Sequence, residues 1–363
     1  MSILLFFLIL LLLVLVHEFG HFIVAKLFKI RVDEFAFGFP PRIFSIKKGE
    51  TNYSFNALPI GGYVSIYGEN ALQIQDDADK GRSFAAKSRW VQSAVIVAGV
   101  VFNLILAWIL ISGTLMMGIA SPADNDTGYP VQNAKLMVTE LAAKGPAETA
   151  GLKPGDTLVS LSDGVETVAA DSPEAVSSFI GPREGKEIMV TYTRKGEAGH
   201  VNVTPIQGIS QKGAAIGIYM DMVGTLKLPF FAALKDGAVK TYLFTKLTAV
   251  GIYTFIYHAV AGDADYSQVT GPVGIVGAVG EAAGIGFANL VLFTALISIN
   301  LAVINIIPFP ALDGGRFLFI LIEGITRKPI KPQISNVMNF VGFALLMLLM
   351  VAVTYHDVAK LMR

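Results

Sequence analysis

The sequence predicts a polytopic α-helical membrane protein with one β-rich domain inserted between its helices. Of the 363 residues, 53% are hydrophobic and only 15% are charged, and the mean hydropathy is +0.59. Soluble domains usually carry about 25% charged residues, so this deficit indicates a chain that lies largely in a lipid bilayer. The zero net charge gives no reason to expect nucleic acid as a partner. The chain has no cysteine, which leaves His, Asp, Glu and Asn as candidate metal ligands.

Four segments are long and apolar enough to predict transmembrane helices, at about residues 3–27, 91–119, 287–307 and 337–354. The first begins directly after Met1 and Ser2. It lacks the basic start and the small-residue cleavage site of a secretory signal, which favours a retained helix. A signal anchor without chemistry is the alternative for this segment.

The region between the second and third helices changes in composition. Residues 121–206 are rich in Gly, Pro, Asp, Glu and Thr and contain short alternating runs such as residues 188–192, which predicts a soluble, mostly β domain. The stretch GPAETAGLKPGD at residues 145–156 resembles one typical of PDZ domains, which bind peptides by adding a strand to a sheet edge. An unspecialised β insert is the alternative. The chain thus divides into a first membrane half (1–120), the PDZ-like domain (121–206) and a second membrane half (207–363).

The topology follows from the basic residues. They crowd the loop after the first helix, and none precedes Ile3, so the positive-inside rule puts that loop in the cytoplasm and the N-terminus outside. The second helix then returns outward, and the β-rich domain is extracytoplasmic.

Residues 229–258 are ambiguous because charged side chains interrupt an apolar segment. If this segment does not span, the helix at 287–307 runs inward, and the basic residues that follow it lie in the cytoplasm, as the same rule prefers. If it does span, His17 and Asp313, both candidate metal ligands, lie toward opposite faces of the membrane and cannot meet. We therefore predict an interfacial amphipathic helix at 229–258, four transmembrane helices and two extracytoplasmic termini.

The first predicted helix contains the pattern HExxH at residues 17–21. On a helix this pattern places two imidazoles, from His17 and His21, one turn apart on one face, where both reach one zinc ion. Glu18 then lies beside the metal as general base. Ionisable residues in an apolar helix are costly and usually functional; two core histidines are the alternative, and they leave Glu18 unexplained. His17 lies about 21 Å along the helix from Ile3, which places the metal inside the bilayer, toward the cytoplasmic face.

The candidate third ligand is Asp313. Pro308 and Pro310 end the preceding helix, and Gly314 permits a tight turn just after the carboxylate. A helix-capping aspartate is the alternative for this residue taken alone.

These motifs resemble those of the site-2 protease family of intramembrane zinc metalloproteases, and specifically its bacterial regulator-of-sigma-E protease branch. The family carries HExxH in its first membrane helix and N-x-x-P-x-P-x-L-D-G in a later one, here residues 305–314. The resemblance runs nearly end to end, including one PDZ-like insert, LPIGGYV at 58–64, GPVGI at 271–275 and a G-x-x-x-N pattern at 99–103.

The resemblance implies one Zn²⁺ per chain, held by His17, His21 and Asp313, in a multi-pass protein of the bacterial inner membrane. It implies that about residues 35–68 fold back into the membrane as a β-hairpin beside the site; a hairpin on the cytoplasmic surface is the alternative. The expected substrates are transmembrane segments of membrane proteins, such as anti-sigma factors or remnant signal peptides. The candidate substrate-binding residues are Asn103, Asn305, Gly61 and Gly62, and for the two asparagines helix packing is the alternative.

Two other function classes remain open. An intramembrane metal transporter would also use His and Asp, but it would not require Glu18 or an external peptide-binding module. A non-catalytic PDZ scaffold in the membrane would keep the module and tolerate loss of His17 or His21.

Overall fold

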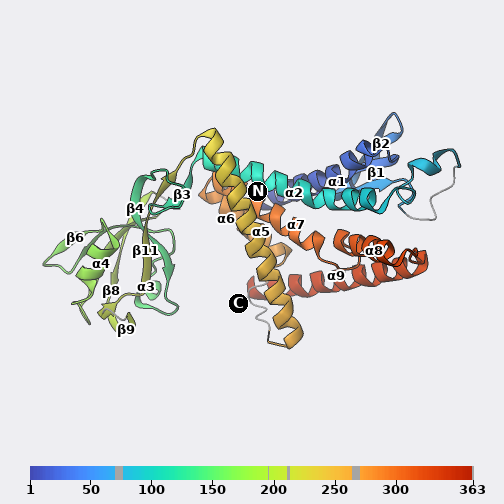
Figure 1. The fold of residues 1–363 in the computed structure, drawn as a ribbon. Helices are drawn as coiled ribbons and strands as arrows, with labels where there is room; N and C mark the ends of the chain where they lie inside the picture. The colour runs from blue at the N-terminus through green and yellow to red at the C-terminus, as the bar shows by residue number, and fades with distance from the viewer. Residues whose placement is uncertain (70–76, 195, 211–212, 264–269, 362–363) are drawn as a thin grey trace. The chain divides into compact units, whose positions relative to one another are not determined.

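The computed structural model describes residues 1–69, 77–194, 196–210, 213–263 and 270–361 (Figure 1). The chain divides into two compact units. One consists of residues 1–114 and 233–363, and the other of residues 115–232. The first is mostly helical and the second is mostly β.

The helical unit is built from long apolar segments. In chain order the helices are α1 Ser2–Leu27, the 3₁₀-helix η2 Asp77–Arg82, α2 Arg89–Met117, α5 Phe230–Ala261, α6 Pro272–Ile285, α7 Phe287–Ile306, α8 Asp313–Thr326 and α9 Pro332–Leu361. The helices α1 and α6 pack together, as do α6 and α7. Leu13 and Val279 are fully buried at this junction.

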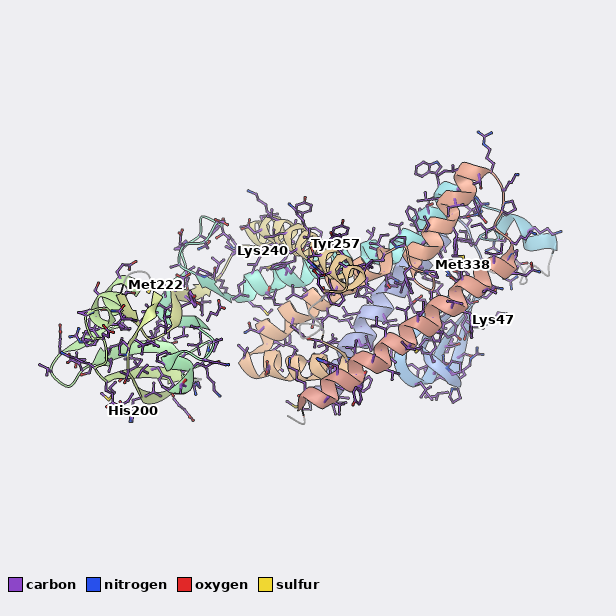
Figure 2. The ribbon with its side chains drawn as sticks, turned by 90° about the horizontal axis from the view of Figure 1, so that it is seen from below. Lys47, His200, Met222, Lys240, Tyr257 and Met338 are labelled. Atoms are coloured by element: carbon purple, nitrogen blue, oxygen red, sulfur yellow. The ribbon has the colours of Figure 1, made fainter. Side chains whose placement is uncertain are left out.

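Five helices among the described residues are long and apolar enough to cross a membrane, namely α1, α2, α5, α7 and α9. The expectation of several apolar helices is therefore confirmed, whereas the count of four is not, because α5 also meets the criterion. Only Ala233, Gly237 and Thr241 of α5 are buried, and Lys240 and Tyr257 project from it (Figure 2). Its buried end packs on α2, where Trp108 Nε1 donates a 2.8 Å hydrogen bond to the carbonyl oxygen of Leu234.

A bent β-hairpin lies beside α1. Strands β1 Val32–Lys48 and β2 Thr51–Ile66 turn at Gly49 and Glu50. Both strands fold back on themselves, so that residues 34–37 pair with residues 52–55 on one side and with residues 62–65 on the other. The hairpin therefore forms a small four-segment sheet, with residues 62–66 along one edge.

The hairpin turn is anchored by charge. Glu50 pairs with Lys26 of α1, with Nζ and Oε1 2.6 Å apart, and with Arg82 of η2. Burial raises the pKa of Glu50, but the hydrogen bonds from Lys26 and Arg82 outweigh it and hold that pKa below its usual range. The turn is thereby tied to the end of α1 that follows His17 and His21.

The β-rich unit is a seven-stranded sheet with two short helices. Its strands are β3 Ile119–Pro122, β4 Gln132–Leu141, β5 Thr157–Ser162, β6 Thr167–Ala169, β7 Ile188–Arg194, β8 Glu197–Val203 and β11 Ile218–Leu226, in the order β3-β11-β4-β5-β7-β8 with β6 beside β5. Strands β9 Ile206–Ser210 and β10 Gly213–Ala215 form a separate ribbon, and α3 Pro146–Thr149 and α4 Pro173–Ile180 complete the unit. Strand β11 follows the range 121–206 predicted for this domain, yet it pairs within the same sheet.

The core of this unit is formed by alternate strand residues and one helix face. Leu161 and Val190 of the sheet and Val176 of α4 are fully buried. Ser172 caps α4 by accepting a hydrogen bond from the backbone N–H of Ala175. Val176, Phe179 and Ile180 of this helix are buried in the same core as the sheet residues.

Candidate metal centre

His17 and His21 share one face of α1. They are four residues apart, each is 7% exposed, and their rings meet edge to face with centroids 4.8 Å apart. Their Nε2 atoms lie 3.2 Å from each other. The helical spacing alone therefore brings two imidazole nitrogens to one point, as the sequence predicts.

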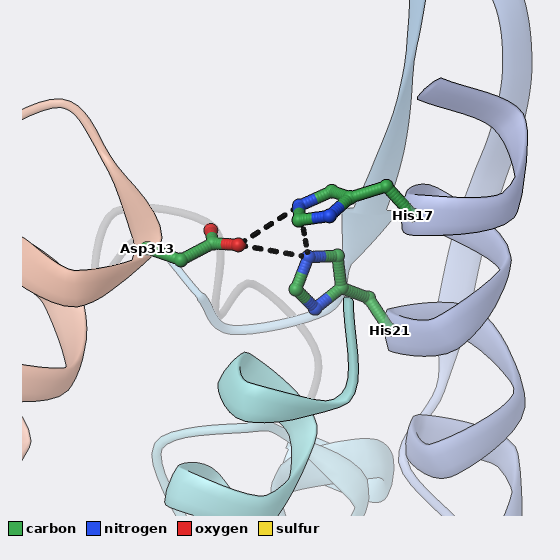
Figure 3. Close-up of side chains that lie close together, drawn as sticks. All are labelled: His17, His21 and Asp313. Carbon is green, nitrogen blue, oxygen red and sulfur yellow. Dashed lines mark hydrogen bonds and ion pairs between the residues drawn. The ribbon is translucent and has the colours of Figure 1, made fainter. Parts of the chain in front are cut away.

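Asp313 reaches the same point from the other end of the chain. Helix α7 ends at Ile306, and α8 begins at Asp313 itself. Oδ2 of Asp313 is 2.9 Å from Nε2 of His17 and 3.3 Å from Nε2 of His21 (Figure 3). The three candidate ligand atoms lie within 4.8 Å of one another.

The chemistry of this donor set fits zinc. Two imidazole nitrogens and one carboxylate oxygen are the ligands of many catalytic zinc sites, in which the fourth position is left for water or substrate. Nδ1 of His21 is 2.8 Å from the carbonyl oxygen of Val95, which can only accept, so Nδ1 carries the hydrogen. The lone pair of neutral His21 is therefore on Nε2, the atom that faces Asp313.

Helix α2 lies directly against the two histidines because of a glycine. A Cβ atom on Gly99 would be 2.5 Å from Nε2 of His21 and 2.7 Å from Cε1 of His17. In return, a Cβ on Gly20 of α1 would be 2.5 Å from the carbonyl oxygen of Ala98. Any larger side chain at either position would push the two helices apart.

Glu18 lines a polar cavity of about 240 Å³ next to the histidines. The cavity is also bordered by His21, Asp313 and Tyr63. A carboxylate that borders the same space as the candidate ligands is suitably placed for proton transfer.

Two of the four candidate substrate-binding residues, Asn103 and Asn305, lie beside His17, and the other two are in the hairpin. Nδ2 of Asn103 is 3.2 Å from Nδ1 of His17, and Nδ2 of Asn305 is 3.5 Å from its Nε2. Gly61 and Gly62 lie in β2, where a Cβ on Gly62 would meet the carbonyl oxygen of Ala36 at 2.8 Å. Substrate binding by these four residues stays a prediction.

Sequence reasoning missed two charged residues at this cavity. Glu69 and Arg316 both border it and form an ion pair with each other. Arg316 follows Asp313 by three residues on α8, so helical spacing places it on nearly the same face. Its pairing with Glu69 depends on tertiary structure, and no local pattern signals it.

The comparison with known families is decisive for the class of the protein. The model of peptidase family M50 matches residues 5–349. The chain belongs to peptidase family M50. Zinc metalloprotease RasP of Oceanobacillus iheyensis is 30% identical to it over 96% of each chain, and Regulator of sigma-W protease RasP of Bacillus subtilis is also 30% identical over 96% of each.

Membership of the M50 family confirms three expectations from the sequence. The chain is a site-2-type zinc metalloprotease, its metal is zinc, and it is a membrane protein. Among solved structures, the PDZ domain of an SdrC-like protein of Listeria monocytogenes matches 25% of this M50 chain and 93% of its own length, at 21% identity and a TM-score of 0.21. A similarity this low does not assign the fold of the β-rich unit.

Proposed function

We propose that this M50 protease cleaves membrane-spanning protein segments at a zinc ion held by His17, His21 and Asp313. The observation that carries this proposal is the meeting of three ligand atoms within 4.8 Å, from residues up to 296 positions apart in sequence. A bound zinc ion would act as a Lewis acid toward the scissile carbonyl and lower the pKa of a coordinated water.

Glu18 is the proposed general base. Its position on the cavity wall lets it accept a proton from the attacking water and return that proton to the leaving amine. Glu18 does not belong to the ligand cluster formed by its two neighbouring histidines and Asp313. Metal binding and proton transfer are therefore carried out by different residues.

The bent hairpin is the proposed docking edge for substrate. The backbone of a transmembrane helix is occupied by its own hydrogen bonds, so the substrate must unwind before attack. Tyr63, Val64 and Ile66 line the same cavity as Glu18 and belong to the edge segment of the hairpin sheet. A substrate strand that pairs with this edge would satisfy its backbone groups inside the membrane.

The substrate class is proposed from the Bacillus relative, whose name describes a regulator of a sigma factor. We propose single-pass membrane proteins of the anti-sigma-factor type, with remnant signal peptides as the other candidate. In the proposed topology the site lies toward the cytoplasmic side of the bacterial inner membrane. Both termini and the β-rich unit are extracytoplasmic, and α5 lies in the interface.

The β-rich unit is the proposed PDZ-like module. A hollow of about 350 Å³ is lined by Ser177 and Ile180 of α4 and by residues 218–220 of β11. A helix beside a strand is the arrangement in which PDZ domains add a peptide strand to their sheet. We propose that the module binds substrate peptides there and excludes substrates with bulky outer domains.

The proposal is tested by replacing Glu18 with Gln in the full-length, reconstituted protein. Zinc content should remain that of the wild type, because no ligand changes, while cleavage of a transmembrane substrate should fall by at least about 100-fold because the general base is lost. Undiminished turnover by Glu18→Gln would refute the role of Glu18. A zinc chelator should abolish cleavage by the wild type; cleavage that survives removal of the metal would refute the zinc site itself.

A further inference from the structure

Asn103 is a buried amide beside His17, and one end of that amide has no partner. The side chain is 0% exposed, and Nδ2 lies 3.2 Å from Nδ1 of His17. At the other end, Oδ1 is the one buried side-chain polar atom without a hydrogen-bond partner among the residues that the structure describes. An acceptor buried in this way is costly and calls for an explanation.

The backbone at Asn103 is held in place from the other side. Ser298 of α7 donates a 2.8 Å hydrogen bond from Oγ to the carbonyl oxygen of Asn103. The amide therefore projects from a fixed point on α2, and its two ends can exchange places only by rotation about the last side-chain torsion.

The ligand cluster dictates which end of the amide should face His17. Nε2 of His17 points at Asp313 and His21, so it must present a lone pair to a metal ion. In neutral imidazole the hydrogen is then on Nδ1, the atom that faces Asn103. An N–H group requires an acceptor, and an amide nitrogen is not one. The oxygen and nitrogen of a carboxamide have nearly the same shape, so a 180° turn places Oδ1 opposite Nδ1.

We propose that Asn103 is a positioning residue that accepts a hydrogen bond from Nδ1–H of His17 through Oδ1. It holds His17 in the tautomer and orientation in which Nε2 binds zinc, and Oδ1 takes the place beside His17 that Nδ2 occupies in the structure. This inference rests on the proposed function, because it takes His17 as a zinc ligand. It differs from the substrate-binding role predicted for Asn103 from the sequence.

The two histidines are then oriented by the same helix. The carbonyl oxygen of Val95 accepts from Nδ1 of His21. In the proposed orientation of the amide, Oδ1 of Asn103, eight residues later on α2, accepts from Nδ1 of His17. Gly99 lies midway between them and lets α2 approach both rings. Residues four apart share a helix face. Val95, Gly99 and Asn103 therefore lie in a row on the face of α2 that contacts the two histidines.

The experiment compares Asn103→Leu, Asn103→Asp and the wild type as full-length protein in detergent, without substrate. Leucine has nearly the same shape and no acceptor, whereas aspartate keeps an oxygen in place. Thr294→Val on α7 is the control for a buried polar change, because the side chain of Thr294 donates its hydrogen bond within its own helix, to the carbonyl oxygen of Leu290. Zinc affinity is measured by competition with a chelator, and circular dichroism and gel filtration establish that each variant is folded.

We expect zinc affinity to fall by about 10- to 100-fold in Asn103→Leu, which is the usual effect when a metal-binding histidine loses the residue that hydrogen-bonds to its other ring nitrogen. Asn103→Asp and Thr294→Val should stay within about threefold of the wild type. Because aspartate keeps the acceptor, loss of zinc from a folded Asn103→Asp variant would overturn the inference even if Asn103→Leu fails to fold.

A second readout follows the hydrogen bond itself. In zinc-loaded protein labelled with ¹⁵N-histidine, the Nδ1–H proton of His17 should exchange slowly with water in the wild type and Asn103→Asp, and fast in Asn103→Leu. The Nδ1–H proton of His21, bonded to Val95, is the internal reference. Wild-type affinity and unchanged exchange in Asn103→Leu would overturn this inference and leave the proposed function intact. A wild-type protein that binds no zinc would overturn the proposed function instead.

Discussion

At the scale of single residues, the candidate metal centre depends on the absence of a side chain at Gly99 as much as on the three ligands. The two imidazoles lie on one face of α1, and the backbone of α2 approaches the same two rings at a distance that only glycine permits. The pairing of His17 with His21 follows from helical spacing and could be predicted from the sequence. The approach of Gly99 could not, because it depends on how two helices pack.

Replacing Gly99 with Ala should weaken zinc binding. The added methyl group would lie 2.5 Å from Nε2 of His21, a distance that neither the ring nor the helix backbone can accept without moving. We expect at least a tenfold loss of zinc affinity, measured by competition with a chelator. Gly113→Ala on the same helix is the matched control, since a Cβ there meets nothing within 4 Å. Equal affinity in the two variants would contradict the proposed packing.

At the scale of elements, the β-rich unit contains an ion pair between the buried carboxylate of Asp156 and the side chain of Arg194, which is 33% exposed. Asp156 is 1% exposed and receives two hydrogen bonds from Arg194 at the end of β7, at 2.6 and 2.7 Å, and one from the backbone N–H of Lys153. The Asp156 hydrogen bonds raise the pKa of Arg194. Asp156 ends the stretch GPAETAGLKPGD, so the sequence pattern marked a structural residue without indicating its partner.

Replacing Arg194 with Met should destabilise this unit by about 1–3 kcal/mol, because the buried carboxylate of Asp156 loses two charged hydrogen-bond donors, while solvent screens the exposed part of the pair. The expected result is faster hydrogen exchange in β5 and β7 of the full-length protein, measured by mass spectrometry. Gln207→Ala removes an exposed hydrogen bond to Glu184 and is the control, with an expected effect within about 0.5 kcal/mol. Equal protection in both variants would show that the pair of Asp156 and Arg194 does not stabilise the sheet.

At the scale of the whole molecule, the membrane class and the protease family could be predicted from the sequence, while the number of spans could not. Helix α5 is long and apolar enough to cross a bilayer, yet charged residues interrupt it, namely Lys235, Asp236, Lys240 and Lys246. The composition of α5 is compatible with both an interfacial helix and a spanning one. The placement of Asp313 beside His17 was predicted from a family resemblance, because no local pattern links residues 296 positions apart.

The topology can be tested by single-cysteine labelling, since the natural chain has no cysteine. A membrane-impermeant maleimide added outside intact cells should label Val165→Cys in the β-rich unit and Asp263→Cys just after α5. It should leave Lys328→Cys, after α8, unlabelled until the membrane is opened. Protection of Asp263→Cys from outside would show that α5 spans the membrane and would contradict the interfacial placement.

The zinc site formed by His17, His21 and Asp313 is tested most directly by the zinc content of purified Asp313→Ala beside that of the wild type, measured by mass spectrometry of the metal. Asp313 carries the oxygen ligand of the proposed site, and it comes from a segment of the chain far from the two histidines. We expect one zinc ion per wild-type chain and nearly none in a folded Asp313→Ala variant. One zinc ion per chain in that variant would contradict the proposed metal centre.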